Sequence, residues 1–140
     1  MPIATQLIVT LENKPGTLAQ VAGLLGEGGV NIKGFSAPAA VEADGRKGEI
    51  RLLVAEMEKA RTILSTHKIG FREEEVLVLS LENKPGALSH VVDHLKEAQI
   101  NIESGYCTPS REGKRAIVVL SVSDTKKAHE ILKVESLDEI

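Results

Sequence analysis

The sequence has almost no aromatic side chains: its 140 residues contain two Phe, one Tyr and no Trp. Platforms that bind single-stranded nucleic acid use exposed rings for base stacking, so this composition disfavours them. The net charge of −3 also gives no basic footprint for DNA or RNA. We therefore expect no nucleic-acid partner, and a core built from Val, Ile, Leu and Ala.

Long apolar runs and cysteines are equally scarce. No segment approaches the roughly 20 apolar residues that a membrane span needs, and the first residues, MPIATQLIVTLENK, lack the basic start and cleavage site of a signal peptide. The single cysteine, Cys107, excludes an intrachain disulfide and fits a reducing compartment. We interpret Cys107 as a small strand residue, because no nucleophilic site is identifiable around it. These features predict a cytoplasmic protein without membrane contact.

What the sequence does contain is an internal repeat. LENKPGTL at residues 11–18 returns as LENKPGAL at 81–88, and VNIKGFS at 30–36 returns as INIESGY at 100–106. EKARTIL at 58–64 matches KKAHEIL at 126–132, so the second copy has lost two residues in the intervening loop. Loops tolerate such losses better than the elements that they connect. We therefore predict two copies of one domain, at residues 1–73 and 74–140.

Each copy has the pattern strand, helix, strand, strand, helix. We expect the first helix of each copy to start at the proline of the repeated phrase, and Gly28 to end the first of them. Asp124 or Ser123 is expected to cap the last helix. This order predicts an α+β fold in which each copy is a ferredoxin-like βαββαβ domain, an antiparallel sheet with two helices on one face. The helical periodicity predicts buried faces at Leu18, Val21, Ala22 and Leu25, at Leu88, Val91, Val92 and Leu95, at Ala60, Ile63 and Leu64, and at Ala128, Ile131 and Leu132.

The junction between the copies has no turn residues. After THKIG, only residues 71–81 remain for the last strand of copy one and the first strand of copy two. We therefore predict one long strand that both copies share. The second copy ends at KVESLDEI, so its own fourth strand is expected to be short or missing.

The repeated phrase places a Pro-Gly bend at the start of a helix. Backbone N–H groups there lack intrahelical partners and the helix dipole is positive, which suits a carboxylate. Gly16 and Gly86 would let a ligand come close, and neighbouring carboxamides could accept from an ammonium group or donate to a carboxylate. This combination suits a free amino acid. The alternative interpretation is structural, because asparagines also form Asx turns and Pro-Gly is common turn chemistry.

The segments LENKPGTLAQVAGLLGEGGVNI (11–32) and LENKPGALSHVVDHLKEAQINI (81–102) resemble ACT domains. These are regulatory βαββαβ modules that bind amino acids, usually where two such domains meet. The resemblance covers both copies and implies that the glycine turn and the asparagine opening the second strand line an effector pocket. A serine-binding member of the family has His where this chain has Leu11 and Leu81, which implies a more apolar pocket here. The implied ligand-binding residues are Asn13, Gly16, Thr17, Leu18, Asn31 and Ile32, and Asn83, Gly86, Ala87, Leu88, Asn101 and Ile102.

The resemblance implies a non-enzymatic amino-acid sensor without catalytic residues or cofactors. It would act through a partner enzyme or through its own assembly, as a homodimer formed by ACT sheets or helices, with its effector at ACT–ACT interfaces. The alternative is a regulatory subunit of an amino-acid biosynthetic enzyme such as acetolactate synthase, although that family carries a different second domain.

Two other functions are less favoured by the sequence. An acylphosphatase-type enzyme would need an arginine on the first loop, where this chain has Lys14. His90 and His94 lie four residues apart on a helix, a spacing that can hold zinc or nickel. The first copy has Gln20 and Leu24 there, so we expect solvated histidines and no metal site.

Overall fold

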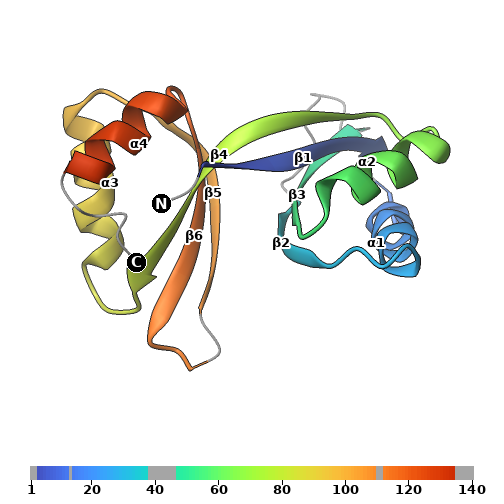
Figure 1. The fold of residues 1–140 in the computed structure, drawn as a ribbon, viewed down its shortest axis with the longest axis horizontal. Helices are drawn as coiled ribbons and strands as arrows, with labels where there is room; N and C mark the ends of the chain where they lie inside the picture. Colours follow the sequence, from blue (N-terminus) through green and yellow to red (C-terminus); the bar gives the residue numbers. More distant parts are fainter. Residues whose placement is uncertain (1–2, 13, 38–46, 110–111, 135–140) are drawn as a thin grey trace. The chain divides into compact units, whose positions relative to one another are not determined.

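The structure is a computed structural model that describes residues 3–12, 14–37, 47–109 and 112–134 (Figure 1). The chain divides into two compact units. Thr5–Glu74 form the first unit, and the described residues from Glu75 onward form the second unit together with Ile3 and Ala4.

The first unit is an antiparallel sheet with two helices on one face (Figure 1). Its elements are β1 (Ile3–Glu12), α1 (Thr17–Glu27), β2 (Ile32–Ser36), β3 (Lys47–Val54), α2 (Met57–Thr66) and the start of β4 (Phe71–Glu82). The strand order is β2-β3-β1-β4, and β3 runs antiparallel to both β1 and β2. Alternate strand residues meet the helices in a core of Leu7, Val9, Val21, Leu25, Val30, Ile50, Leu52, Val54, Ala60 and Leu64.

The second unit repeats this architecture with the rest of β4. Its other elements are α3 (Ala87–Glu97), β5 (Ile102–Pro109), β6 (Arg115–Val122) and α4 (Thr125–Val134). The strand order is β4-β6-β5, and both pairings are antiparallel. The helices α3 and α4 cover one face of these strands (Figure 1) through a core of Leu77, Leu79, Leu81, Val91, Leu95, Ile100, Val118, Leu120, Val122, Ala128 and Leu132. The expected ferredoxin-like repeat is confirmed.

The strand β4 runs without interruption from Phe71 to Glu82, so the predicted shared strand is confirmed. Phe71 at its start packs against the core of the first unit, whereas Leu77 and Leu79 belong to the core of the second unit. Ile3, at the start of β1, packs against that second core. The residues after Val134, where a fourth strand of the second copy was sought, lie outside the described part of the chain. The division into domains 1–73 and 74–140 stays a prediction.

Local capping residues account for where the helices end, but the predicted helix starts differ from those in the structure. The helix α1 ends at Gly28, as predicted, and Asp124 caps α4 by accepting from the Lys127 N–H at 3.1 Å. The starts of α1 and α3 were placed too early, because Gly16 and Gly86, both in a left-handed conformation, are the N-caps and the prolines stand before them. Each helix can begin only after its glycine has turned the chain.

The buried faces are mostly as predicted, but Ala22 and Val92 are only half-buried and belong to neither core, and Leu88 departs further. Val21, Leu25, Val91 and Leu95 are buried, and Leu18 packs against the first core, but Leu88 is 49% exposed. The prediction for Leu88 was therefore wrong. Leu88 lies in the first turn of α3, ahead of the buried Val91 and Leu95. Cys107 is an exposed residue of β5.

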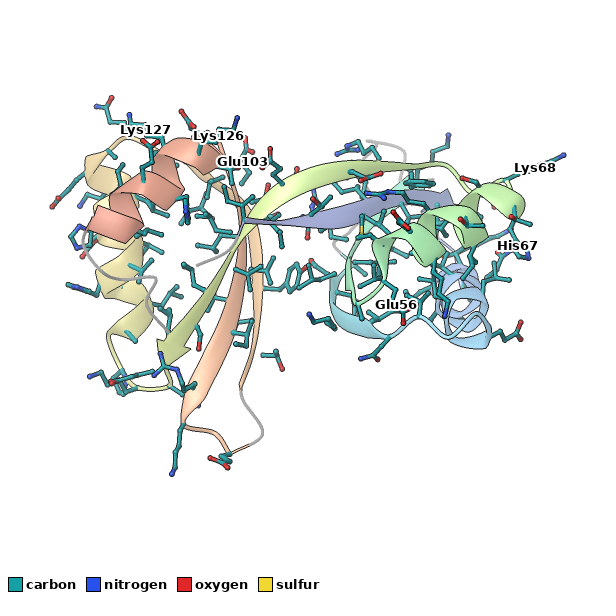
Figure 2. The ribbon with its side chains drawn as sticks, viewed as in Figure 1. Glu56, His67, Lys68, Glu103, Lys126 and Lys127 are labelled. Carbon is teal, nitrogen blue, oxygen red and sulfur yellow. The ribbon has the colours of Figure 1, made fainter. Side chains whose placement is uncertain are left out.

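Polar contacts tie helix ends together in the second unit. Lys127, at the start of α4 in Figure 2, donates from Nζ to the carbonyl of Ala98 at 3.2 Å, and Ala98 is the C-cap of α3. A cation suits the negative end of a helix dipole. In the first unit the aligned Lys59 instead pairs with Glu56 at 3.3 Å, at the N-cap of α2. None of the helices in the described residues has the length and apolar character of a membrane-spanning helix.

Candidate functional site

The two repeated turns have nearly the same backbone. Gly16 has φ 96° and ψ −14°, and Gly86 has φ 87° and ψ −13°. Each turn is closed by a bond to the lysine carbonyl, from Thr17 N at 3.5 Å and from Ala87 N at 3.3 Å. The one chemical difference is the Thr17 hydroxyl, which donates to Lys14 O at 3.1 Å. The left-handed conformation favours glycine, because a Cβ would crowd the adjoining backbone there.

After each turn, the first backbone N–H groups of the helix have no side-chain cap. Neither α1 nor α3 has a side-chain cap, and the first intrahelical bonds are Gln20 N to Gly16 O at 2.9 Å and His90 N to Gly86 O at 3.0 Å. The backbone N–H of Leu18 in α1 therefore has no acceptor among the described residues, and neither does the backbone N–H of Leu88 in α3. Apart from the glycine and its two chain neighbours, no described residue comes within 4 Å of a Cβ built on Gly16 or Gly86. Open space and unpaired donors suit an anionic group.

A cavity of about 300 Å³ opens beside the first of these turns. It brings together three of the predicted residues, Gly16, Thr17 and Leu18. Its volume suits a ligand of a few heavy atoms rather than a large cofactor. The other lining residues are Leu11, Glu12, Lys14, Pro15, Ala37, Gly48, Glu49 and Ile50.

The turn carries an ion pair in each repeat. Lys14 Nζ lies 2.8 Å from Glu12 Oε2, and Lys84 Nζ lies 2.7 Å from Glu82 Oε2. The hydrogen bond from Lys14 lowers the pKa of Glu12, and the same bond raises the pKa of Lys14. Lys84 lowers the pKa of Glu82 in the same way. Each turn thus carries an exposed lysine paired with a neighbouring carboxylate.

The predicted asparagines differ in their positions. Asn13 lies outside the described residues. Asn83 lies against the loop before β6, because its Nδ2 donates to Gly113 O at 2.9 Å and its backbone N–H donates to Lys114 O at 2.8 Å. The side-chain NH₂ group of Asn83 therefore donates a hydrogen bond to the main chain in this structure.

The asparagines that open the second strands lie at the other end of the helix. Gly16 precedes α1 and Asn31 follows it, and the 11 residues of α1 span about 16 Å. Asn101 has the same place after α3, where its N–H donates to Ser123 Oγ at 3.0 Å. The side-chain amides of Asn31 and Asn101 are exposed. One unit alone therefore does not bring the glycine turn and this asparagine together.

A second, more open hollow of about 510 Å³ lies at that far end in the second unit. It contains the predicted Asn101 and Ile102, but not Gly86, Ala87 or Leu88. Ile102 is 36% exposed, whereas its counterpart Ile32 packs against the first core. The remaining lining residues are Val92, Asp93, Lys96, Gln99 and Ile100.

The family follows from a match along the whole chain. The model of a family described as an ACT domain pair matches residues 1–140. The chain belongs to this family. ACT domains are regulatory modules, and the two units are the two members of the pair.

Three crystal structures resemble this ACT domain pair. A protein from Bacteroides thetaiotaomicron is 29% identical with a TM-score of 0.87, over 97% of this chain and 90% of that one. The ligand-free regulatory subunit of aspartate kinase from Thermus thermophilus is 15% identical, with a TM-score of 0.64, over 95% and 96%. The corresponding subunit from Thermus flavus is 15% identical with a TM-score of 0.61, over 93% of this chain and 88% of that one. These two kinase subunits support the fold alone. A comparison with curated proteins gives no match.

Sequence reasoning missed two acidic residues of the first ACT domain's cavity. Glu12 is part of the repeated phrase, so the repeat itself could have pointed to it. Glu49 carries no such signal, because β6 has Ile117 at the aligned position. Its place beside the glycine turn depends on the pairing of β3 with β1, which the sequence does not state.

The two helix histidines face each other without further ligands. The rings of His90 and His94 are 5.1 Å apart between centroids and nearly perpendicular. No group of three or more His, Cys, Asp or Glu side chains that could hold a metal ion occurs among the described residues. The expectation that this pair holds no metal stays a prediction.

Proposed function

We propose that this ACT domain pair is a non-enzymatic regulatory protein that binds a small amino acid. The observation that carries the proposal is the glycine turn, which is built twice with the same left-handed backbone and the same uncapped helix start. A free carboxylate is the natural guest of such a helix end. In the first unit, the turn also borders a cavity of suitable size.

The effector is held where two ACT domains meet. This follows from the separation of Gly16 and Asn31 across the length of α1, since a small ligand cannot reach both residues in one domain. A second domain would supply the missing amide. Leu88 and Ile102, both exposed, give the second domain apolar surface at each end of α3 for such a contact. We therefore propose a homodimer as the binding-competent form.

The regulated target is a partner enzyme of amino-acid metabolism in the cytoplasm. An effector shifts such a partner only if it binds two states of the regulator with different affinity. The Thermus thermophilus relative is named as a regulatory subunit of aspartate kinase, which is an example of this arrangement in another protein. The acetolactate synthase alternative stays a prediction, and no contact in the structure favours it.

A thermal-shift screen against the twenty common amino acids tests the proposal. A true effector at 100 times its Kd stabilises the folded chain by about 2.7 kcal/mol. Hits are then titrated by calorimetry, and the mass of the free and bound protein is measured by light scattering. Absence of any stabilising amino acid at 10 mM would overturn amino-acid binding, and a bound monomer would overturn the shared site.

A further inference from the structure

The open hollow at the far end of α3 is bordered by two side chains of opposite charge. Asp93 and Lys96 both line this space of about 510 Å³, and both are exposed. Opposite charges three residues apart on a helix commonly pair with each other. Among the described residues, however, neither the Asp93 carboxylate nor the Lys96 ammonium has an ion pair or a hydrogen bond. Both charges are therefore available to a ligand in the hollow.

Two carboxamides complete the polar lining of the hollow. The side chains of Gln99 and Asn101 face it, and in the described part of the chain neither amide has a hydrogen-bond partner. The backbone of Asn101 is held in place, because its N–H donates to Ser123 Oγ at 3.0 Å and its carbonyl accepts from Ser123 N at 2.9 Å. An amide in this position can accept from an ammonium group or donate to a carboxylate.

The first unit has no charged group at the aligned place. The offset that relates Gly16 to Gly86 also relates the three polar helix-end residues of the hollow to glycines. The residues that correspond to Asp93, Lys96 and Gln99 are Gly23, Gly26 and Gly29. The asparagine is the one polar residue of the hollow that both copies share, as Asn31 and Asn101. The two charges are therefore a property of the second unit.

We propose that Asp93 and Lys96 select a zwitterion, with the ligand ammonium against the Asp93 carboxylate and the ligand carboxylate against Lys96 Nζ. This inference rests on the proposed function and adds which side chains distinguish the two charges of the effector. The glycine turn of a second domain would contact the same ligand carboxylate. A single exposed charge contributes little because water screens it, so recognition depends on both charges contacting one ligand.

The apolar part of the hollow indicates the side chain of the ligand. Val92 is half-buried and Ile102 is 36% exposed, so both offer apolar surface beside the charged groups. An aliphatic side chain on the ligand would cover this surface and remove it from water. The chemical class is therefore an aliphatic α-amino acid of the size of valine or leucine. It is bound once per chain, because the first unit lacks both charges.

Probes that each lack one charged group test this assignment. L-leucine is compared with 4-methylpentanoate, which lacks the ammonium, and with 3-methylbutylamine, which lacks the carboxylate. L-valine is compared in the same way with 3-methylbutanoate and 2-methylpropylamine. All are titrated into the full chain by NMR, which measures millimolar affinities and locates the contact. We expect one of the two amino acids to bind about tenfold more tightly than either of its partners, with the largest shifts at Asn101 and Ile102.

Two neutral variants then assign each charge to its residue. Asp93→Asn should weaken the amino acid and the amine but not the acid, whereas Lys96→Gln should weaken the amino acid and the acid but not the amine. The matched controls Glu97→Gln and Lys126→Gln remove the same charges from exposed positions outside the hollow and should change no affinity. Circular dichroism and thermal unfolding establish that each variant is folded.

The outcomes separate this site from the proposed function. If Asp93→Asn and Lys96→Gln change no affinity, or weaken all three probes of a set equally, the role of the two charges is overturned while amino-acid binding stands. If the chain binds another of the twenty amino acids but neither valine nor leucine, the aliphatic class is overturned. If it binds no amino acid, the proposed function falls too.

Discussion

Gly16 and Gly86 occupy the same left-handed backbone conformation at the same place in two domains, with φ values of 96° and 87°. Each follows a Lys-Pro pair and precedes a helix whose first donors are uncapped. The conformation lets the chain leave a strand, turn sharply and enter a helix without a side chain over the helix end. The conservation of this shape between the two halves explains why the phrase LENKPG occurs twice.

Replacing either glycine by alanine should destabilise the protein. An L-residue in this conformation costs about 1 kcal/mol relative to glycine, even though the added Cβ would meet no atom within 4 Å. Gly16→Ala and Gly86→Ala are expected to lower the free energy of unfolding by that amount, measured by urea denaturation. Gly16→Ala should also weaken effector binding, because it places a methyl group beside the cavity.

Gly23 offers a matched control for this prediction. It lies inside α1 and also has open space around an added Cβ, but its backbone is not left-handed. Gly23→Ala should therefore stabilise the protein by about 0.5–1 kcal/mol through helix propensity. Equal effects at Gly16 and Gly23 would contradict the conformational argument.

The ion pair between Arg61 and Glu73 should make stability depend on pH. Arg61 Nε and Nη2 donate to the two carboxylate oxygens of Glu73 at 2.9 and 2.8 Å, which joins α2 to β4. This hydrogen bonding lowers the pKa of Glu73 below its ordinary value of 4.5. A lowered carboxyl pKa in the folded state stabilises the protein above the unfolded-state value, and the contribution disappears as pH falls through the folded-state value.

Glu73→Gln should thus lower stability at pH 7 by more than at pH 3, which lies below the ordinary carboxyl pKa of 4.5. The loss will be small, because the pair is partly exposed and solvent screens it. Urea denaturation at the two pH values measures the difference, with Glu75→Gln on the same strand as control. A loss that is equal at both pH values would show that the substitution acts through packing instead.

The repeat made much of this fold predictable. Matching segments identified both helices of each domain, and the lack of a turn residue between Phe71 and Leu81 predicted the shared strand β4. The start of α1 was harder to place, because proline is compatible with the first helical turn and only the positive φ of Gly16 excludes it. Hydrophobic periodicity also could not show that Leu88 stays exposed, because periodicity gives the face of a helix and not how far the core extends along it.

The candidate site was predictable only in part. The turn residues belong to a repeated sequence segment, so Gly16, Thr17 and Leu18 could be identified without a structure. Asn31 lies at the opposite end of α1 from Gly16 because the helix is 11 residues long. The spacing of the two residues in the motif does not by itself show this distance. Glu49 reaches the same cavity from a strand that lies more than thirty positions later in the chain, and only strand pairing reveals it.

Ile3 should contribute to the stability of the second unit despite its place at the start of the chain. Its side chain packs against the core that contains Leu77 and Leu79. Ile3→Ala is expected to lower the free energy of unfolding by about 1–2 kcal/mol, less than for a fully buried isoleucine because Ile3 is half-buried.

Hydrogen exchange can localise this effect. Amide protection should fall in α3 and α4 of the Ile3→Ala variant more than in α1 and α2, because stability is not uniform across a structure. Thr10→Ala, at an exposed position of the same strand, serves as the control. A uniform loss of protection would instead indicate that the two units unfold as one.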